Sequence, residues 1–286
     1  MFFIPLIRFN NNFYSYITRI KYFLIQSIGS IFLLASILFL ILLNKNIFFQ
    51  ITIIVSLLWK IGFPPFHFWL FSLIIELNWI IFFLLSSWQK ILPFFLVRKI
   101  YINFFDIFII LRLFVCVVRS SQQSSIKKLI IFSTIFTSSW VLGSIIIFKN
   151  IWLILLALYR ILLGFFISLS LSYNFSRKDS LNTNQINQID KVFLFLIFLS
   201  IAGIPPFIRF FIKVWVLFII ISFKKIFLAF TFVISSIFII FIYTRIFLRG
   251  LIYSCSINKL NYTKKIFPLS FYLFSLTAGP VIFLYY

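Results

Sequence analysis

The chain has 286 residues, of which 63% are hydrophobic and only 10% charged, and its 26 Lys and Arg residues against four acids give a formal net charge of +22. A soluble domain of this length would carry far more polar surface, so the composition excludes a water-soluble fold. The excess of Lys and Arg does not indicate a nucleic-acid partner, because many of these residues fall in short connections, where anionic lipid headgroups and the positive-inside bias account for them.

Apolar runs of roughly 20 residues, long enough to cross a bilayer, follow one another along the chain. We predict a single all-α, polytopic membrane domain over residues 1–286 with about nine or ten spans. Residues 173–191 and 255–265 are polar and are predicted to be loops. The residues after Met1 lack the pattern of a cleavable signal peptide. The spans are expected, in chain order, at 20–43, 47–63, 66–86, 87–98, 103–118, 126–148, 150–173, 191–221 with a break near Pro205, 223–249 and 266–286.

Two of these spans are interrupted by the same five-residue pattern. Gly62-Phe63-Pro64-Pro65-Phe66 follows Lys60, and Gly203-Ile204-Pro205-Pro206-Phe207 precedes Lys213, about half a chain further on. Consecutive prolines break a helix and leave carbonyl groups free, which a bilayer tolerates only beside a cavity or a water. Breaks at corresponding positions of two halves are typical of the transport site of a repeat-built carrier, so we predict an ion-translocating membrane protein.

Charged residues inside these spans are the candidate functional residues, since each costs on the order of 3 kcal/mol to insert. A buried lysine can exchange a proton, whereas arginine stays charged. Lys60 lies beside the first break, Lys90 midway along the apolar segment that follows it, and Lys213 after the second break. These three are the expected proton-relay residues, although each could instead extend to the interface or pair with a backbone carbonyl. His67 and Glu76 are weaker candidates. Arg160, Arg209 and Arg245 also fall within or at the rims of spans.

No redox or metal centre is expected in this chain. Cys116 and Cys255 lack CxxC or His spacing, and His67 is the only imidazole, so neither a metal site nor a nucleophilic triad can be assembled from the sequence. The two cysteines are expected to be structural.

Several segments, in the same order, resemble the subunit 2 family of mitochondrial NADH dehydrogenase, an antiporter-like subunit of respiratory complex I. The resemblance covers nearly the whole chain and rests on residues 20–26, 60–69, 88–93, 122–128, 202–207 and 243–245. It implies two inverted repeats, at about 1–120 and 121–250, each with one Pro-broken helix, followed by a C-terminal helix at about 266–286.

The resemblance also implies a function. The chain would be a proton-translocating membrane-arm subunit of NADH:ubiquinone oxidoreductase in the inner mitochondrial membrane, in which Lys60, Lys90 and Lys213 match the family's relay lysines. NADH, FMN, Fe–S clusters and ubiquinone would be bound by other subunits and no cofactor by this chain. The expected partners are other membrane-arm subunits and lipid, cardiolipin included, with no nucleic acid.

Departures from the family pattern keep two alternatives open, a stand-alone cation/proton antiporter and a structural membrane-arm spacer that has lost transport. The glutamate that partners the first lysine in the family would fall a few residues before Met1, and Thr137 occupies the place of a family histidine. Arg19, Arg119 and Arg209 stand at small-residue positions, and Met is scarce. Translation of mitochondrial codons with the wrong genetic code would explain both features, which we hold as a hypothesis.

Overall fold

A computed structural model describes residues 13–42, 47–74, 77–99, 105–123, 126–147, 151–172 and 188–255. All regular secondary structure in these ranges is α-helical, which confirms the predicted all-α class. The expected span at 266–286 and most of the two polar loops lie outside the described residues. The helices are α2 (Phe13–Leu42), α3 (Ile47–Ile61), α4 (Phe68–Ile74), α5 (Trp79–Ser87), α6 (Ile91–Lys99), α7 (Phe105–Ser121), α8 (Ile126–Ile147), α9 (Ile151–Ser172), α10 (Gln188–Ala202), α11 (Ile208–Ser222) and α12 (Ile226–Cys255).

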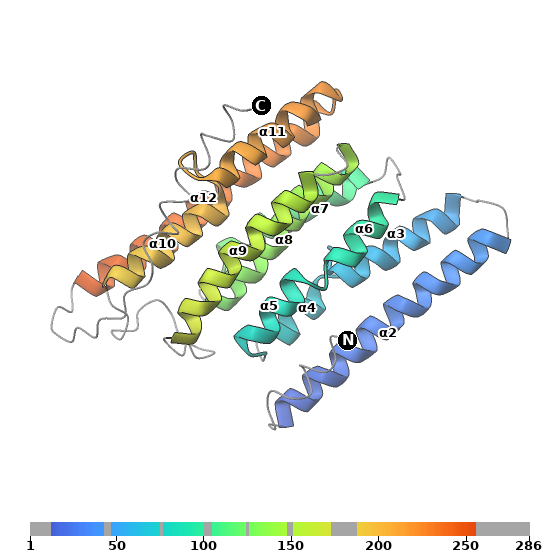
Figure 1. Ribbon diagram of the computed structural model, residues 1–286, viewed down its shortest axis with the longest axis horizontal. Helices are drawn as coiled ribbons and strands as arrows, with labels where there is room; N and C mark the ends of the chain where they lie inside the picture. Colours follow the sequence, from blue (N-terminus) through green and yellow to red (C-terminus); the bar gives the residue numbers. More distant parts are fainter. Residues whose placement is uncertain are drawn as a thin grey trace.

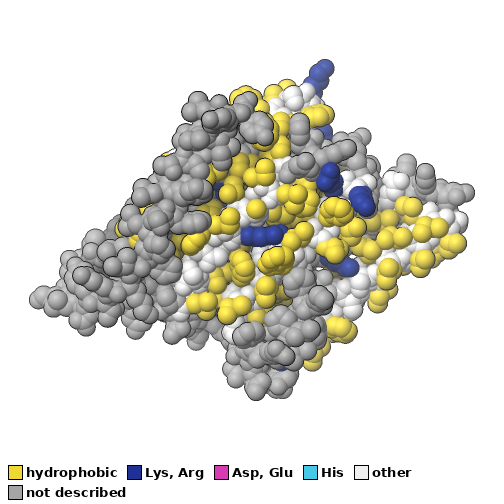
Figure 2. All heavy atoms as spheres, viewed as in Figure 1, with side chains coloured by type: hydrophobic (Ala, Val, Ile, Leu, Met, Phe, Trp, Pro, Cys, Tyr) yellow, Lys and Arg dark blue, Asp and Glu magenta, His cyan; other side chains and the backbone are white. Residues whose placement is uncertain are grey.

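Five described segments are long and apolar enough to cross a membrane: Ile17–Leu42, Trp79–Lys99, Ile126–Ile145, Ile151–Leu171 and Ile226–Arg245. Large hydrophobic side chains such as Phe32 of α2 and Phe227 of α12 are more than 60% exposed. Figure 2 shows hydrophobic side chains over much of the described surface, with only scattered Lys and Arg. A continuous apolar surface of this kind fits a lipid-facing protein.

Helix α8 lies at the centre of the described part of the molecule. In Figure 1, α7, α8 and α9 lie between α2–α6 on one side and α10–α12 on the other. Helix α8 packs against α4, α6, α7, α9 and α11. Its side chains from Leu129 to Ile145 are all buried. The outermost helix, α2, instead packs mainly against α3 and exposes most of its side chains.

The sequence of α8 suits this central position because its Ser and Thr side chains are small and their hydroxyls are satisfied within the helix. Its Ser and Thr hydroxyls donate to the carbonyl three or four residues earlier, as in Ser133 to Ile130 and Ser144 to Val141, both at 2.7 Å. Such back-bonding removes the cost of an unpaired hydroxyl in an apolar interior. The helix therefore brings paired hydroxyl groups into the core, whereas the Trp140 indole N–H is buried without a hydrogen-bond partner.

Both predicted helix breaks are present. Helix α3 ends at Ile61 and α4 begins at Phe68, whereas α10 ends at Ala202 and α11 begins at Ile208. Gly62 and Gly203 each follow the helix end with φ of 76° and 80°, in the left-handed region that glycine adopts without strain. The Gly62 N–H bonds Trp59 O and the Phe63 N–H bonds Leu58 O, the Schellman pattern of a helix C-terminus.

The boundary predicted between spans 66–86 and 87–98 is wrong. Helix α4 already ends at Ile74, and α5 and α6 together form the apolar segment Trp79–Lys99, with a turn at residues 88–90 inside it. The N–H groups of Trp88 and Gln89 both bond Leu84 O, so the helix widens by one residue here. Lys90 therefore lies at a local irregularity inside one span, which the sequence did not indicate.

Candidate functional site

Lys213 on α11 is buried against the second helix break. Its side chain is 5% exposed, and Nζ donates to the carbonyl of Ala202, the last residue of α10. The same Nζ lies 5.0 Å from the ring centroid of Phe136 and 5.3 Å from that of Trp140, both on α8. A Cβ atom at position 203 would lie 2.8 Å from Nζ, so the glycine is needed for this close approach. The helix break thus supplies both the carbonyl that accepts the hydrogen bond from Lys213 and the space for the end of its side chain.

Lys90 is also buried against α8. It is 5% exposed, at the turn between α5 and α6, and its Nζ donates to Thr134 O at 3.4 Å. Nearby at the same turn, Arg160 of α9 donates to Ser87 O at 3.4 Å. The structure therefore brings two of the three predicted relay lysines onto the central helix.

Lys60 is placed differently. It lies in the last turn of α3, is only partly buried, and packs beside α2, where a Cβ at Gly29 would lie 3.2 Å from its Cγ. The structure therefore places Lys60 on the side of α3 that faces α2, apart from the contacts that Lys90 and Lys213 make with α8.

His67 is buried at the start of α4 and packs among aromatic rings. Its ring centroid lies 4.4 Å from that of Phe68 and 5.6 Å from that of Phe71, and it is 4% exposed. Glu76 lies outside the described residues. Arg245, another intramembrane cation of the sequence, is exposed.

A buried arginine lies near each of Lys90 and Lys213. Arg112 of α7 is completely buried, donates from Nε to Ile135 O at 2.8 Å and from Nη2 to Ser138 Oγ, and has Cζ 3.7 Å from the Phe63 ring centroid. Arg209 of α11 is 3% exposed and donates from Nη1 to Ile201 O at 3.0 Å. Our sequence reasoning missed Arg112, although its position amid the apolar run of α7 was a usable signal.

These buried cations are solvated by carbonyls, hydroxyls and rings. Asp106 has the one carboxylate side chain that the structure describes, and this carboxylate forms a 2.6 Å ion pair with Lys225. Carbonyl oxygens and aromatic faces stabilise a positive charge without neutralising it permanently. A lysine held in this way can lose and regain a proton without breaking a salt bridge.

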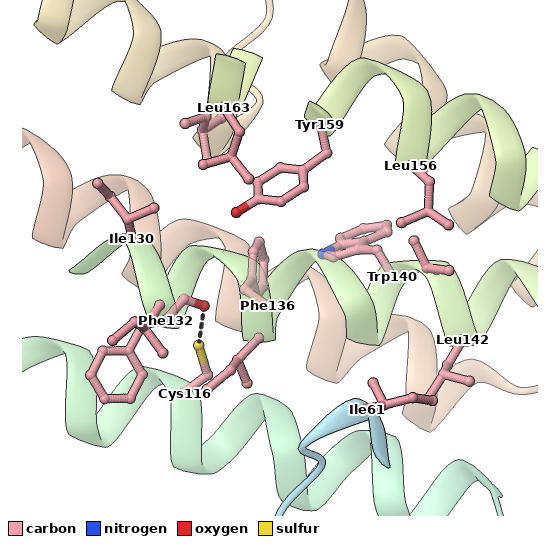
Figure 3. Close-up of a cluster of buried hydrophobic side chains, with 14 of the residues drawn as sticks. Ile61, Cys116, Ile130, Phe132, Phe136, Trp140, Leu142, Leu156, Tyr159 and Leu163 are labelled. Carbon is pink, nitrogen blue, oxygen red and sulfur yellow. Dashed lines mark hydrogen bonds between the residues drawn. The ribbon is translucent and has the colours of Figure 1, made fainter. Parts of the chain in front are cut away.

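Hydroxyl groups of α8 and α9 meet on one side of α8. The Ser133 Oγ and Tyr159 OH atoms lie 3.2 Å apart, and Thr137 Oγ1 donates to Thr134 O at 3.2 Å. Figure 3 shows Tyr159 of α9 reaching toward α8, while Cys116 of α7 lies on the other side of that helix. The Cys116 thiol is free, buried and bonded to Phe132 O at 3.1 Å.

No group of three or more His, Cys, Asp or Glu side chains that could hold a metal ion occurs in the ranges that the structure describes.

Comparison with known proteins identifies the relatives of the chain. Residues 1–239 match the family model of the NADH:quinone oxidoreductase/Mrp antiporter transmembrane region. NADH-ubiquinone oxidoreductase chain 2 of Anopheles gambiae is 36% identical over 223 residues, covering 74% of this chain and 64% of that protein. The Artemia franciscana protein of the same name is 35% identical over 195 residues, covering 68% and 62%. The chain thus spans less than two thirds of the length of these two relatives.

Solved structures share the fold. A chain of respiratory complex I from Thermus thermophilus superposes with a TM-score of 0.72 at 16% identity, covering 96% of this chain and 67% of that one. A chain of the Mrp complex from a Dietzia species gives a TM-score of 0.71 at 14% identity, covering 83% and 51%. The predicted resemblance is confirmed, and the chain belongs to the NADH:quinone oxidoreductase/Mrp antiporter transmembrane family, within which it resembles NADH-ubiquinone oxidoreductase chain 2.

Proposed function

We propose that the chain is a proton-translocating membrane-arm subunit of NADH:ubiquinone oxidoreductase, in which Lys90 and Lys213 relay protons while electron transfer takes place in other subunits. The observation that carries the proposal is that both lysines are buried against α8, each beside an irregular turn. Each donates a hydrogen bond to a backbone carbonyl, and no carboxylate side chain that the structure describes pairs with either of them. Lys60, which is half-buried at the first break, is the third proposed relay residue.

The geometry supports proton exchange at the lysines in two ways. The Ala202 and Thr134 carbonyls accept hydrogen bonds from the ammonium forms of Lys213 and Lys90, which favours the charged state. The permanent charges of Arg209 and Arg112 lie close by and favour the neutral state. His67 and Glu76 remain weaker candidates for the same pathway.

The proposed cofactors and partners follow from the relatives. NADH, FMN, Fe–S clusters and ubiquinone would be bound by other subunits, and this chain would contribute membrane helices to their complex. Its neighbours would be other membrane-arm subunits and anionic lipid, cardiolipin included, in the inner mitochondrial membrane. The family model also covers Mrp antiporter chains, so a stand-alone cation/proton antiporter is the second candidate, and a spacer that has lost transport is a third.

The test is to change Lys90 and Lys213 singly to Met in inner-membrane vesicles that carry the assembled complex. We expect at least a tenfold loss of proton translocation per NADH oxidised, because the thioether cannot carry a proton. Lys99→Met is the matched control, since Lys99 is exposed at the end of α6.

Each alternative has its own outcome in this experiment. Normal translocation in both variants, with the chain present in the complex, would support the spacer. Cation-dependent proton exchange by the isolated chain would support the stand-alone antiporter.

A further inference from the structure

Arg160 is a charged residue near the middle of a membrane span. It belongs to α9, a helix of 22 residues, and lies about 13 Å along the helix axis from Ile151 and about 18 Å from Ser172. Because the hydrocarbon core of a bilayer is about 30 Å thick, both headgroup regions are far from Arg160. A cation at this depth is costly unless a partner compensates it, so its partners need to be identified.

The chain itself gives Arg160 few partners. Its Nη2 donates to Ser87 O at 3.4 Å, and its Cζ lies 5.4 Å from the ring centroid of Trp88. Ser87 O can accept this bond because the Ile91 N–H bonds Trp88 O at the turn between α5 and α6. The Nε atom of Arg160 is buried without a hydrogen-bond partner among the described residues. One long hydrogen bond and one ring satisfy only part of a guanidinium with five N–H donors.

The other two buried arginines of the core are enclosed by the chain. Arg112 donates to Ile135 O at 2.8 Å and Arg209 to Ile201 O at 3.0 Å, and both side chains are almost completely buried. Each also has one nitrogen without a partner, but that nitrogen is sealed inside the bundle. Arg160 is only partly buried, so a neighbouring molecule can reach its guanidinium.

The surface around Arg160 is apolar. Trp88, against which the guanidinium lies, is 51% exposed, and Leu153 and Ile161 of α9 are 47% and 45% exposed. Lipid tails can cover these side chains but offer no acceptor to the guanidinium. A carboxylate at the same depth would accept two parallel hydrogen bonds from it and compensate its charge. Asp106, whose carboxylate the structure describes, is already paired with Lys225.

We propose that Arg160 and Trp88 are the centre of a docking surface for a transmembrane helix of another subunit, which carries an Asp or Glu at mid-membrane. The carboxylate of that helix accepts hydrogen bonds from the Arg160 guanidinium, and its apolar side chains pack on Trp88, Leu153 and Ile161. Charge complementarity favours this occupant over lipid. The inference rests on the proposed function, because the partner belongs to the same assembled complex.

The first test is retention of the chain in the complex. Membranes with Arg160→Gln, Arg160→Lys or the unaltered chain are solubilised in rising detergent, and the chain in the NADH-dehydrogenase band of a native gel is measured. We expect at least a tenfold loss of retention for Arg160→Gln, because the partner carboxylate is left unpaired, and a smaller loss for Arg160→Lys. Arg98→Gln is the matched control, since Arg98 lies in the last turn of α6, where its side chain can extend to the headgroups.

The second test identifies the partner. Dicyclohexylcarbodiimide, which enters membranes, couples an amine to a carboxylate in direct contact: an amide bond forms, and the carbodiimide takes up the water as a urea. In the Arg160→Lys complex we expect an amide between position 160 and an Asp or Glu in a membrane span of another subunit, found by peptide mass spectrometry. The unaltered complex is the control, because it has no amine at this position.

The outcomes separate this inference from the proposed function. Arg160→Gln retained as well as Arg98→Gln, a missing cross-link, or a cross-link to this chain's own residues would overturn the docking surface while the subunit role stands. Absence of the unaltered chain from the complex would overturn both. Peptides that show a small residue at position 160 would also overturn the docking surface and would extend the codon hypothesis to this position.

Discussion

Gly203 is the single residue on which the position of Lys213 depends most directly. Its φ of 80° is unfavourable for any side chain, and an added Cβ would lie within 3.2 Å of the Nζ, Cε and Cδ atoms of Lys213. The lysine end can move, but only by giving up the Ala202 carbonyl. The glycine thus serves both as a helix C-cap and as the space that admits the ammonium to the break.

Gly203→Ala is therefore predicted to impair proton translocation. Backbone strain costs about 1–2 kcal/mol, and displacement of Lys213 should slow translocation about tenfold. The measurement is proton uptake per NADH oxidised in vesicles with equal amounts of assembled complex. Gly164→Ala is the control, because a Cβ there would meet only Phe83 at 3.9–4.0 Å. Equal translocation by the two alanine variants would contradict this role for Gly203.

At the scale of elements, one ion pair ties the start of α7 to the turn between α11 and α12. Lys225 Nζ and Asp106 Oδ2 are 2.6 Å apart, with the two side chains 24% and 27% exposed. Asp106 lies in the first turn of α7, where its negative charge also interacts favourably with the helix dipole. The sequence alone does not indicate this pair, because the two residues lie 119 positions apart.

Breaking this pair should destabilise the packing of α7 against α12 only modestly. Asp106→Asn is expected to cost about 0.5–1 kcal/mol, since the pair is partly exposed and screened by salt. The measurement is the thermal inactivation temperature of the complex at low and high salt. The exchange of both residues, Asp106→Lys with Lys225→Asp, should recover part of the loss. An unchanged inactivation temperature in Asp106→Asn would show that the pair contributes nothing to stability.

At the scale of the whole molecule, the relatives imply that the chain belongs to a larger complex, which only an experiment on the assembled membrane can test. We predict that peptides of the chain occur in the NADH-dehydrogenase band of a native gel from the source's mitochondrial membranes. Absence from an otherwise intact band would favour a stand-alone antiporter.

The same peptides would test the codon hypothesis. Arg119 is exposed at the end of α7, whereas Arg19 and Arg209 are buried, so the three positions differ in environment. Peptide masses that show a small residue at position 209 would support wrong-code translation and would remove one buried cation from the site. A mass that shows Arg there would refute the hypothesis for that position, and the Ile201 carbonyl would remain its partner.

The sequence by itself determined the class of the protein and the places where its helices break. Uniform apolarity leaves helices as the way to satisfy the backbone in lipid, and two Gly-x-Pro-Pro patterns stop a helix wherever they occur. Both effects depend on local sequence, so they could be predicted. Lys90 could be singled out because it is charged within an apolar span, and Lys213 because it follows the second break.

Only the tertiary structure decided which of these groups meet. Helix α8 carries no charged residue beyond its first turn, and the sequence singled out only Thr137 within its apolar part. In the structure its carbonyls, hydroxyls and rings nevertheless contact Lys90, Arg112 and Lys213. Lys60, which the repeated pattern ranks equally with Lys213, packs instead beside α2. An apolar helix has no periodicity that marks its buried face when all faces are apolar, so partners across helices depend on packing that local sequence does not encode.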